Sequence, residues 1–270
     1  MIHVRVPEDF DPAKIAASGQ CFRVQQAGEG WQFITGQHLL RLQPYTAHRW
    51  QADCTRCTWQ RIWSPYFDFG RDYAAIRAAI PPQDAYLCAA AQYGKGVRVL
   101  RQDAWEMLIT FIISQRKSIP AIKKCVEALC TAFGAQLAPG VYAFPTPQAL
   151  RRAGVDELAK CGLGYRTPYV QAAAQSVAGK TLDLKALANL PDEELLAALM
   201  QCYGVGVKVA NCVALFAYGR VACAPVDVWI ERVIATYYAG RNPFPQYGNA
   251  GILQQYMFYH ALGHKAETRR

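Results

Sequence analysis

The sequence predicts an α+β protein built of two parts, a small antiparallel sheet domain over residues 1–95 and a larger helical region over residues 96–270. Three observations predict this division. Residues 1–95 contain short apolar or alternating runs separated by glycine turns, which is typical of an antiparallel meander. From about Gln102 onward, apolar residues recur at helical spacing. The length of 270 residues accommodates two domains or one large one.

The sheet domain is expected to form from three short strands, which lie at Cys21–Val24, Trp31–Ile34 and Leu39–Leu42. Glycines at positions 28, 30 and 36 supply the turns between them. A first helix is expected over Tyr73–Ile80, where two prolines end it. Further helices are expected over Ala104–Ser114, Ile119–Phe133, Thr146–Ala153, Val155–Cys161, Pro168–Ala178 and Ala250–Leu262.

The composition is that of a basic globular protein. The hydrophobic content is 52%, and no apolar run approaches the length of a membrane span, so no membrane partner is expected. The N-terminal residues lack the charged-then-apolar layout of a secretion signal, which favours the cytoplasm. Lysine and arginine number 29 against 20 acidic residues, and the net charge of +9 favours a polyanionic partner. Charge alone does not separate nucleic acid binding from simple solubility.

Ten cysteines are spread along the chain, several of them within apolar helical stretches. Such positions suit buried free thiols in a reducing compartment better than a disulfide framework. Cys54 and Cys57 have the one metal-like spacing, but a zinc site needs a second pair of ligands and none follows at useful spacing. We therefore interpret Cys54 and Cys57 as ordinary thiols, and a redox role stays open.

The most informative stretch covers residues 193–233. It begins with an amphipathic helix, turns through Gly204-Val-Gly206, and continues in a second helix expected over Val207–Tyr218. Two glycines one residue apart let the backbone turn sharply and approach another molecule closely. The first amides of the second helix have no intrahelical partner, so this hairpin, residues 193–219, can hold a phosphate.

Two chemically useful side chains follow the hairpin turn. Lys208 lies in the first turn of the second helix, where the positive end of the helix dipole disfavours its ammonium form. Asp227 follows Pro225 and Val226 at the start of a third helix and supplies a carboxylate. Each residue alone has an ordinary alternative, because a first-turn lysine is usually solvated and an aspartate that opens a helix is usually an N-cap. The conjunction of hairpin, amine and carboxylate indicates a site.

The order of hydrophobic helix, Gly-Val-Gly-x-Lys, apolar helix and Pro-Val-Asp resembles the helix-hairpin-helix superfamily of DNA glycosylases. Further motifs narrow the resemblance to its 8-oxoguanine DNA glycosylases. They are Gly-Gln-x-Phe-Arg at residues 19–23, Leu-Arg-Gln-Asp at 100–103, Tyr-Ala-Phe-Pro at 142–145 and Gly-Leu-Gly-Tyr-Arg at 162–166. The resemblance implies excision of 8-oxoguanine from duplex DNA in base excision repair, followed by nicking at the abasic site.

The resemblance implies that Lys208 attacks the sugar as a neutral amine and gives a Schiff base that permits β-elimination. Asp227 would stabilise the positive charge that develops on the sugar. No redox or metal cofactor is expected, although the superfamily's hairpin often holds a structural monovalent cation, here through the carbonyls of Met200, Cys202 and Val205. Double-stranded DNA containing 8-oxoguanine is the expected partner, and the protein is expected to act as a monomer.

Four more residues match the base pocket of the family. The carbonyl of Gly19 corresponds to the acceptor for N7–H, which 8-oxoguanine carries and guanine lacks, and a simple turn glycine is the alternative. Cys212 lies four residues after Lys208, on the same helix face, and matches the residue packed against one side of the flipped purine. Gln254 and Phe258 match the amide that reads the polar edge of the base and the ring that stacks on its other side.

A duplex hides its bases, so such an enzyme must extrude the target and fill the gap. Tyr165 and Arg166 match the family's wedge and its contact to the partner base, and a surface turn is the alternative. Arg116 stands where eukaryotic-type enzymes carry asparagine. Because arginine only donates hydrogen bonds, selectivity for cytosine opposite the lesion is expected to weaken.

Three other positions depart from the eukaryotic pattern. Trp229 and Ala261 replace two polar pocket residues, and Tyr203 replaces a proline that is usual in the hairpin. These differences point to a bacterial or archaeal branch.

Two other functions stay open. A monofunctional alkylated-base glycosylase would use water and Asp227 alone, and Lys208 argues against it because those enzymes lack the hairpin lysine. A non-catalytic helix-hairpin-helix DNA-binding protein would have no need for Asp227, or for Gly19, Cys212 and Phe258 together.

Overall fold

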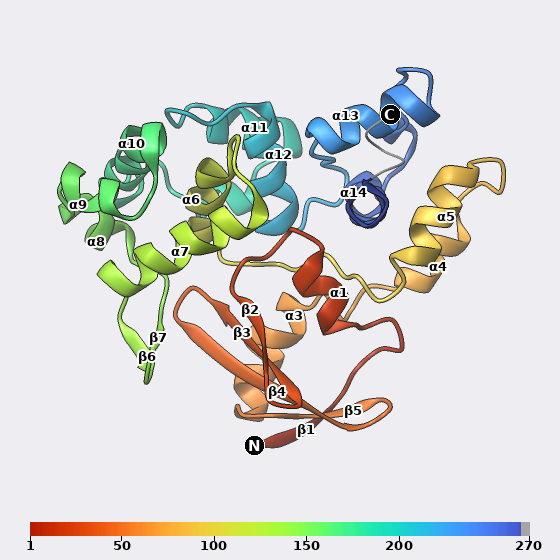
Figure 1. Ribbon diagram of the computed structural model, residues 1–270, viewed down its shortest axis with the longest axis horizontal. Helices are drawn as coiled ribbons and strands as arrows, with labels where there is room; N and C mark the ends of the chain where they lie inside the picture. The colour runs from red at the N-terminus through yellow and green to blue at the C-terminus, as the bar shows by residue number, and fades with distance from the viewer. Residues whose placement is uncertain (266–270) are drawn as a thin grey trace.

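The structure is a computed structural model that describes residues 1–265. It contains an antiparallel sheet of β1 (Ile2–Arg5), β2 (Val24–Ala27), β3 (Gly30–Thr35), β4 (His38–Thr46) and β5 (Arg49–Ala52), in the order β1-β5-β4-β3-β2. Figure 1 shows this sheet at one end of the molecule and most helices in a layer above it. The predicted α+β class, with an N-terminal antiparallel sheet and a larger helical region, is confirmed.

The longer helices are α4 (Tyr73–Ala78), α5 (Ala85–Tyr93), α6 (Ala104–Ser114), α7 (Ile119–Phe133), α8 (Pro147–Arg152), α9 (Val155–Lys160), α10 (Thr167–Ala178), α11 (Asp192–Met200), α12 (Val207–Phe216), α13 (Val228–Tyr237) and α14 (Ala250–Gly263). The predicted bounds of α4, α6–α10, α12 and α14 agree within one or two residues, whereas α5 was not predicted. Short elements complete the fold: α1 (Pro12–Ala17), α2 (Arg56–Thr58), the π-helix η1 (Trp59–Trp63), α3 (Ser64–Tyr66), the hairpin of β6 (Gln136–Ala138) and β7 (Val141–Tyr142), and the 3₁₀ turns η2 (Gly164–Arg166), η3 (Ala186–Asn189) and η4 (Phe244–Gln246). No helix within residues 1–265 is long and apolar enough to cross a membrane.

The sheet buries one face through the alternation that the sequence shows in β3 and β4. Phe33 pairs with Leu40 across the two strands, and both side chains are fully buried, as is Leu42. The helical segment of η1 and α3 covers this face, where Phe67 meets Phe33 edge-on with ring centroids 4.9 Å apart. The sequence did not predict this segment or the two strands β1 and β5.

The predicted strand over Cys21–Val24 is wrong in its bounds, because β2 begins only at Val24. The residues before it bind the helical region instead. Gln20 is fully buried, and its Oε1 accepts a hydrogen bond from the Leu100 amide at 2.7 Å. Phe22 belongs to the core of the helical region. The Gly-Gln-x-Phe-Arg motif therefore fixes this segment between the two parts of the protein.

Two separate cores divide the molecule. The smaller core holds the buried side chains of the sheet together with Trp63 and Phe67, and the larger core holds those of α6–α14. Helices α4 and α5 belong to the larger core through Tyr73 and Leu87, and α5 packs against α14, as Figure 1 shows. Between Phe67 and Tyr73 the chain passes from the smaller core to the larger one, although Phe22 already belongs to the larger core and Leu100 to the smaller one. The division at residue 95 stays a prediction.

Helix α6 links the two parts of the protein. Asp103 caps it by accepting from the Glu106 amide at 2.9 Å, and nearly its whole length is buried. Glu106 is also buried, and its Oε2 accepts from the Gly36 amide of the β3–β4 turn at 2.6 Å. Burial raises the pKa of Glu106 to about 7, against the opposing effect of the Arg23 charge. The C-terminus of α6, at Ser114, reaches the candidate site.

Candidate active site

Helices α11 and α12 form the predicted hairpin. Gly204 has a φ of +84°, and an added Cβ would lie 2.4 Å from the ring of Tyr169, so the turn requires glycine. Gly206 is the N-cap of α12, and the space where its Cβ would stand is open. Val207, the first residue of α12, is 66% exposed. The start of α12 is therefore open to solvent, which is the arrangement that a phosphate site at a helix N-terminus needs.

A cavity of about 40 Å³ lies beside α12. Its lining comes from α6, α12, α14, the turn before α13 and the segment after α1. The lining residues are Gly19, Phe111, Lys208, Cys212, Phe216, Pro225, Asp227, Gln254, Gln255 and Phe258. The structure thus brings all six predicted catalytic and base-recognition residues into one cavity. That juxtaposition depends on the tertiary fold, because the segments are distant along the chain.

Lys208 is half-buried at this cavity. Its Nζ lies 3.5 Å from the hydroxyl oxygen of Ser114 and 5.3 Å from the ring centroid of Phe111, both on α6. Its charge lies near the Cys212 thiol, where it acts to lower the pKa of that thiol against the larger effect of burial. These contacts hold the amine at the cavity, between α6 and α12.

Asp227 is the N-cap of α13, which is the ordinary role considered for an aspartate that opens a helix. It also faces the cavity. Its Oδ1 accepts from the amides of Trp229 and Ile230, each at 3.0 Å. Burial raises the pKa of Asp227, while those two amides and the nearby Lys208 act in the opposite direction. Both capping bonds use one oxygen, so the cap fixes the orientation of the carboxylate while Oδ2 takes no part in it.

Cys212 lines the cavity with an apolar surface, whereas Gln254 lines it with a polar one. Cys212 is 2% exposed, and burial raises the pKa of its thiol to about 11, so it stays neutral and presents an apolar surface. Gln254 is also buried, but its Oε1 has no hydrogen-bond partner within the described part of the chain. A buried acceptor without a partner costs about 1–3 kcal/mol. The cavity therefore offers an acceptor to a donor group of a ligand.

Gly19 is constrained in two ways. Its φ is +75°, and an added Cβ would lie 2.8 Å from Cε1 of Phe258, so a side chain would be both strained and obstructed. The neighbouring peptide groups are fixed, since Gln255 donates to the Ser18 carbonyl at 2.7 Å and Gln20 is bound as described above. Phe258 thus packs directly over Gly19 at the cavity.

The sequence reasoning missed several residues of the lining. Phe216 lies four residues after Cys212, so the helical spacing that related Cys212 to Lys208 would also have found it. Phe111 lies on α6, where residues 105–113 are all buried, so the apolar pattern does not indicate which face of the helix points to a site. Gln255 is buried and acts through the Ser18 carbonyl, and its sequence carries no signal of that role.

The predicted wedge residues lie on two connections close to the hairpin. Arg116 is exposed in the α6–α7 connection, and Tyr165 is 52% exposed in η2. Arg166 is only 5% exposed, and its guanidinium donates to the carbonyls of Gln115 and Leu163. The resemblance implied that this guanidinium contacts the partner base. In this structure Arg166 would have to leave these carbonyls first, and its contact to DNA stays a prediction.

Residues 3–108 match the N-terminal domain of 8-oxoguanine DNA glycosylase, and residues 109–247 match the HhH-GPD superfamily of base excision DNA repair proteins. The chain belongs to this superfamily, in its 8-oxoguanine DNA glycosylase branch.

Relatives within the family are similar along most of the chain. The N-glycosylase/DNA lyase OGG1 of Arabidopsis thaliana is 27% identical over 234 residues, which are 82% of this chain and 64% of that protein. MBOgg1, solved in complex with a low-affinity DNA ligand, is 34% identical with a TM-score of 0.90, over 97% of this chain and 96% of that one. The 8-oxoguanine glycosylase/lyase of Clostridium acetobutylicum, solved with double-stranded DNA containing cytosine opposite 8-oxoguanine, is 30% identical with a TM-score of 0.90, over 97% and 95%. The chain therefore spans less than two thirds of the Arabidopsis protein and nearly all of the two solved chains.

The departures from the eukaryotic pattern of the family lie around the site. Trp229 is half-buried at the start of α13, next to the cap residue Asp227, and Ala261 is fully buried in α14. Tyr203 is 64% exposed in the hairpin turn, where its ring meets Tyr169 edge-on with centroids 4.9 Å apart. The hairpin turn thus presents an aromatic ring to solvent.

The carbonyls expected to hold a monovalent cation lie where α11 ends. The last carbonyls of a helix lack intrahelical partners and carry the negative end of the dipole, which suits a cation. Helix α11 ends at Met200, and the Cys202 carbonyl accepts from the Val205 amide at 3.0 Å, which uses one of its lone pairs. These residues fit such an ion, and its binding here stays a prediction.

Cys54 and Cys57 are free thiols, the first half-buried and the second exposed. Within residues 1–265, no group of three or more histidine, cysteine or acidic side chains could hold a metal ion.

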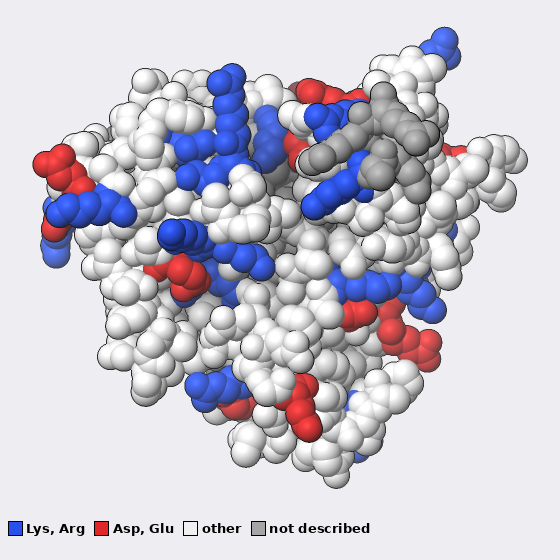
Figure 2. Space-filling model, in the orientation of Figure 1, with Lys and Arg blue, Asp and Glu red and all other residues white. Residues whose placement is uncertain are grey.

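Figure 2 shows lysine and arginine side chains gathered over the α6–α7 connection and the start of α7, on the face that carries the hairpin. The basic residues of that stretch are Arg116, Lys117, Lys123 and Lys124. A basic face next to an open hairpin suits a polyanionic backbone.

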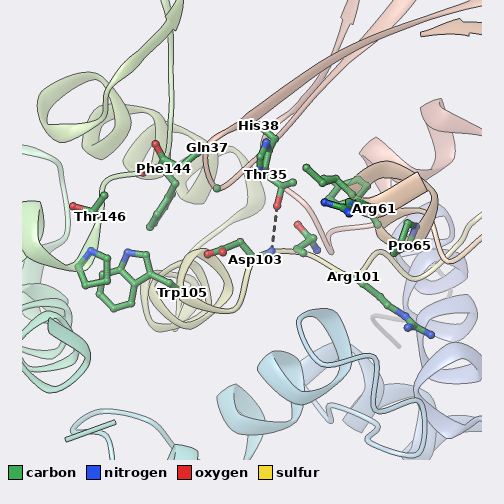
Figure 3. Close-up of a pocket in the computed structure, with 15 residues that line it drawn as sticks. Thr35, Gln37, His38, Arg61, Pro65, Arg101, Asp103, Trp105, Phe144 and Thr146 are labelled. Atoms are coloured by element: carbon green, nitrogen blue, oxygen red, sulfur yellow. Dashed lines mark hydrogen bonds between the residues drawn. The ribbon is translucent and has the colours of Figure 1, made fainter. Parts of the chain in front are cut away.

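A larger cavity, of about 500 Å³, lies at the interface between the sheet domain and α6. In Figure 3, Thr35 and His38 of the sheet face Asp103, whose amide donates to the Thr35 hydroxyl at 3.1 Å. None of the predicted site residues lines this cavity. Its polar groups serve the junction of the two parts, since Asp103 is already the cap of α6.

Proposed function

We propose that this protein is a bifunctional DNA glycosylase and abasic-site lyase that excises 8-oxoguanine from duplex DNA. The observation that carries the proposal is the cavity that joins Lys208 and Asp227 to Gly19, Cys212 and an unpartnered buried acceptor of Gln254. The similarity to MBOgg1 and to the 8-oxoguanine glycosylase/lyase of Clostridium acetobutylicum over nearly the whole chain supports the same activity.

The chemistry follows from the amine and the carboxylate. The neutral amine of Lys208 attacks C1′ of the sugar as the bond to the base breaks, and the base leaves with the electron pair of that bond. Asp227, held by its two capping amides, stabilises the positive charge on the sugar during this step. The C1′–O4′ bond of the adduct then opens, O4′ takes up the proton that the amine releases, and a Schiff base forms. The Schiff base acidifies C2′–H, and β-elimination expels the 3′ phosphate and cuts the strand.

Recognition of the base uses the walls of the cavity. The purine lies between the thiol of Cys212 and the ring of Phe258, and Gln254 accepts from the Watson–Crick edge with its free Oε1. The Gly19 carbonyl accepts N7–H, a donor that guanine lacks. Arg116 and Tyr165 fill the gap left in the duplex, and Arg166 contacts the partner base after leaving its present acceptors.

Borohydride trapping on a panel of duplexes tests the proposal. The panel contains 8-oxoguanine, an alkylated adenine or undamaged guanine at the same position. We expect covalent trapping on the 8-oxoguanine duplex, its loss in the Lys208→Gln variant, and unchanged trapping in Lys185→Gln, which removes an exposed lysine elsewhere. Excision of the alkylated base without trapping would establish the monofunctional alternative, and cross-linking by Lys208→Gln would show that another amine is the nucleophile.

We also propose that the protein acts as a monomer on chromosomal DNA in the cytoplasm. The basic face around the hairpin and the position of all site residues on one chain support this arrangement.

A further inference from the structure

The exposed Arg116 sits in a backbone turn that does not suit it. Residues 114–117 form a turn in which the Lys117 amide donates to the Ser114 carbonyl at 3.2 Å. Gln115 has φ −56° and ψ 121°, and Arg116 has φ +49°. These angles describe a type II turn, whose third residue needs a positive φ and is usually glycine or asparagine. Arginine at that place is strained, so the surrounding structure must hold the turn.

Gln115 is held through hydrogen bonds of both its side chain and its backbone carbonyl. Its side-chain Nε2 donates to the Gly204 carbonyl of the hairpin at 3.0 Å and to the Ile112 carbonyl at 3.2 Å. Its backbone carbonyl accepts from Arg166, at 2.9 Å from Nε and also from Nη2, and from the Tyr165 hydroxyl at 3.4 Å. One half-buried residue therefore joins the turn to the hairpin and to the wedge.

A second anchor holds the other end of the turn. The ammonium of Lys117 donates to the Gly162 carbonyl at 2.8 Å, next to the η2 turn that carries Tyr165. A cap on the last turn of α6 would explain the bond of Gln115 to Ile112, because helix ends leave carbonyls unpaired. It does not explain the bond to Gly204, which lies 89 residues away in the sequence.

We infer that Gln115 is a positioning residue that holds Arg116 in its left-handed conformation and fixes it relative to the hairpin before DNA binds. The functional consequence rests on the proposed function, in which Arg116 enters the gap left by the extruded base. A guanidinium on a preformed turn loses less conformational freedom on binding than one on a mobile loop. Gln115 itself does not touch the base.

The first experiment needs no DNA. Amide hydrogen exchange at Lys117 reports the Ser114–Lys117 turn bond in the whole chain. Gln115→Met keeps the length of the side chain and removes its donor, and we expect the exchange to become at least roughly tenfold faster. Gln115→Glu, which accepts but does not donate, should act in the same direction. Gln148→Met, at an exposed glutamine on α8, is the matched control and should leave the exchange unchanged. Unchanged exchange in both Gln115 variants would overturn the inference.

The second experiment asks whether Gln115 acts through Arg116. Single-turnover excision on an 8-oxoguanine·cytosine duplex is measured for wild type, Gln115→Met, Arg116→Asn and the double variant. Asparagine adopts the left-handed region readily and needs less support. When residue 116 is the native arginine, we expect Gln115→Met to slow excision roughly tenfold, which corresponds to about 1.4 kcal/mol of activation free energy. In the Arg116→Asn background, we expect the same substitution to slow excision by less than about threefold.

The two experiments separate the inference from the proposed function. An equal slowing by Gln115→Met in both backgrounds, or no slowing in either, would overturn the positioning role. If the wild-type chain excises nothing, the proposed function fails, while the exchange at Lys117 still decides whether Gln115 holds the turn.

Discussion

The Gly19 carbonyl offers a direct test of how the lesion is read. Replacing N7 of 8-oxoguanine by carbon removes the donor that this carbonyl should accept and keeps the shape of the purine. The carbonyl cannot turn toward another partner, because Gln255 binds the preceding Ser18 carbonyl at 2.7 Å and Gln20 is tied to the Leu100 amide at 2.7 Å. A buried acceptor left unpaired costs about 1–3 kcal/mol. We therefore expect the affinity for the lesion duplex to fall roughly 5- to 150-fold.

The measurement uses the Lys208→Gln protein, so that binding is observed without excision. Dissociation constants are compared for duplexes that carry 8-oxoguanine or its 7-deaza analogue. Guanine and 7-deazaguanine form the control pair, because N7 of guanine is an acceptor and its removal should not weaken binding. Equal affinity for the two lesion duplexes would refute the assignment of the Gly19 carbonyl as the reader of N7–H.

Three further predictions concern charged groups. Because burial raises the pKa of Asp227 and the chemistry needs its carboxylate, excision should fall on the acid side at a higher pH than an ordinary aspartate would give, and Asp227→Asn should show little excision at any pH in a pH–rate profile. Glu106 has a pKa raised from 4.5 to about 7, so its contribution to stability is complete below pH 4.5 and is lost as the pH rises through 7. Between pH 4.5 and 8, denaturant unfolding should show that the unfolding free energy of wild type falls by about 3 kcal/mol relative to that of Glu106→Gln. Parallel curves of unfolding free energy against pH for the two proteins would contradict this. Since all four partner bases offer an acceptor to Arg116, single-turnover excision opposite the four should differ by roughly tenfold or less, and a preference for cytosine of several hundredfold would place Arg116 elsewhere.

Much of the helical region could be predicted because its signals are local. The glycines of the hairpin fix a turn wherever the rest of the chain lies, and Asp103 and Asp227 cap helices within three residues of themselves. The alternation in β3 and β4 likewise needs only neighbouring residues, as the Phe33–Leu40 pair shows. Recognition of motifs then supplied the site residues, and none of them needed the fold to be named.

The parts of the fold that were not predicted depend on contacts between residues that are distant in the sequence. Strands β1 and β5 pair Ile2 with Ala52, and nothing local in either strand specifies the other. Trp63 at the end of the π-helix η1 is fully buried in the core of the sheet, and nothing local in the sequence indicates that packing. For Arg166 the residue type indicated many donors but not where they would point. Its burial follows from the Gln115 carbonyl, which comes from a different motif.

The cavity in this structure is smaller than the base it is proposed to take. A volume of about 40 Å³ holds a few water molecules and no purine. One wall must therefore move as the base enters. Cys212 is 2% exposed in the middle of α12 and packs in the larger core, so its displacement would disrupt buried contacts. Phe258 is only half-buried at the edge of that core, and its ring packs against Gly19, which has no side chain. The ring of Phe258 is therefore the wall that opens at least cost, and its movement would widen the cavity beside Gly19.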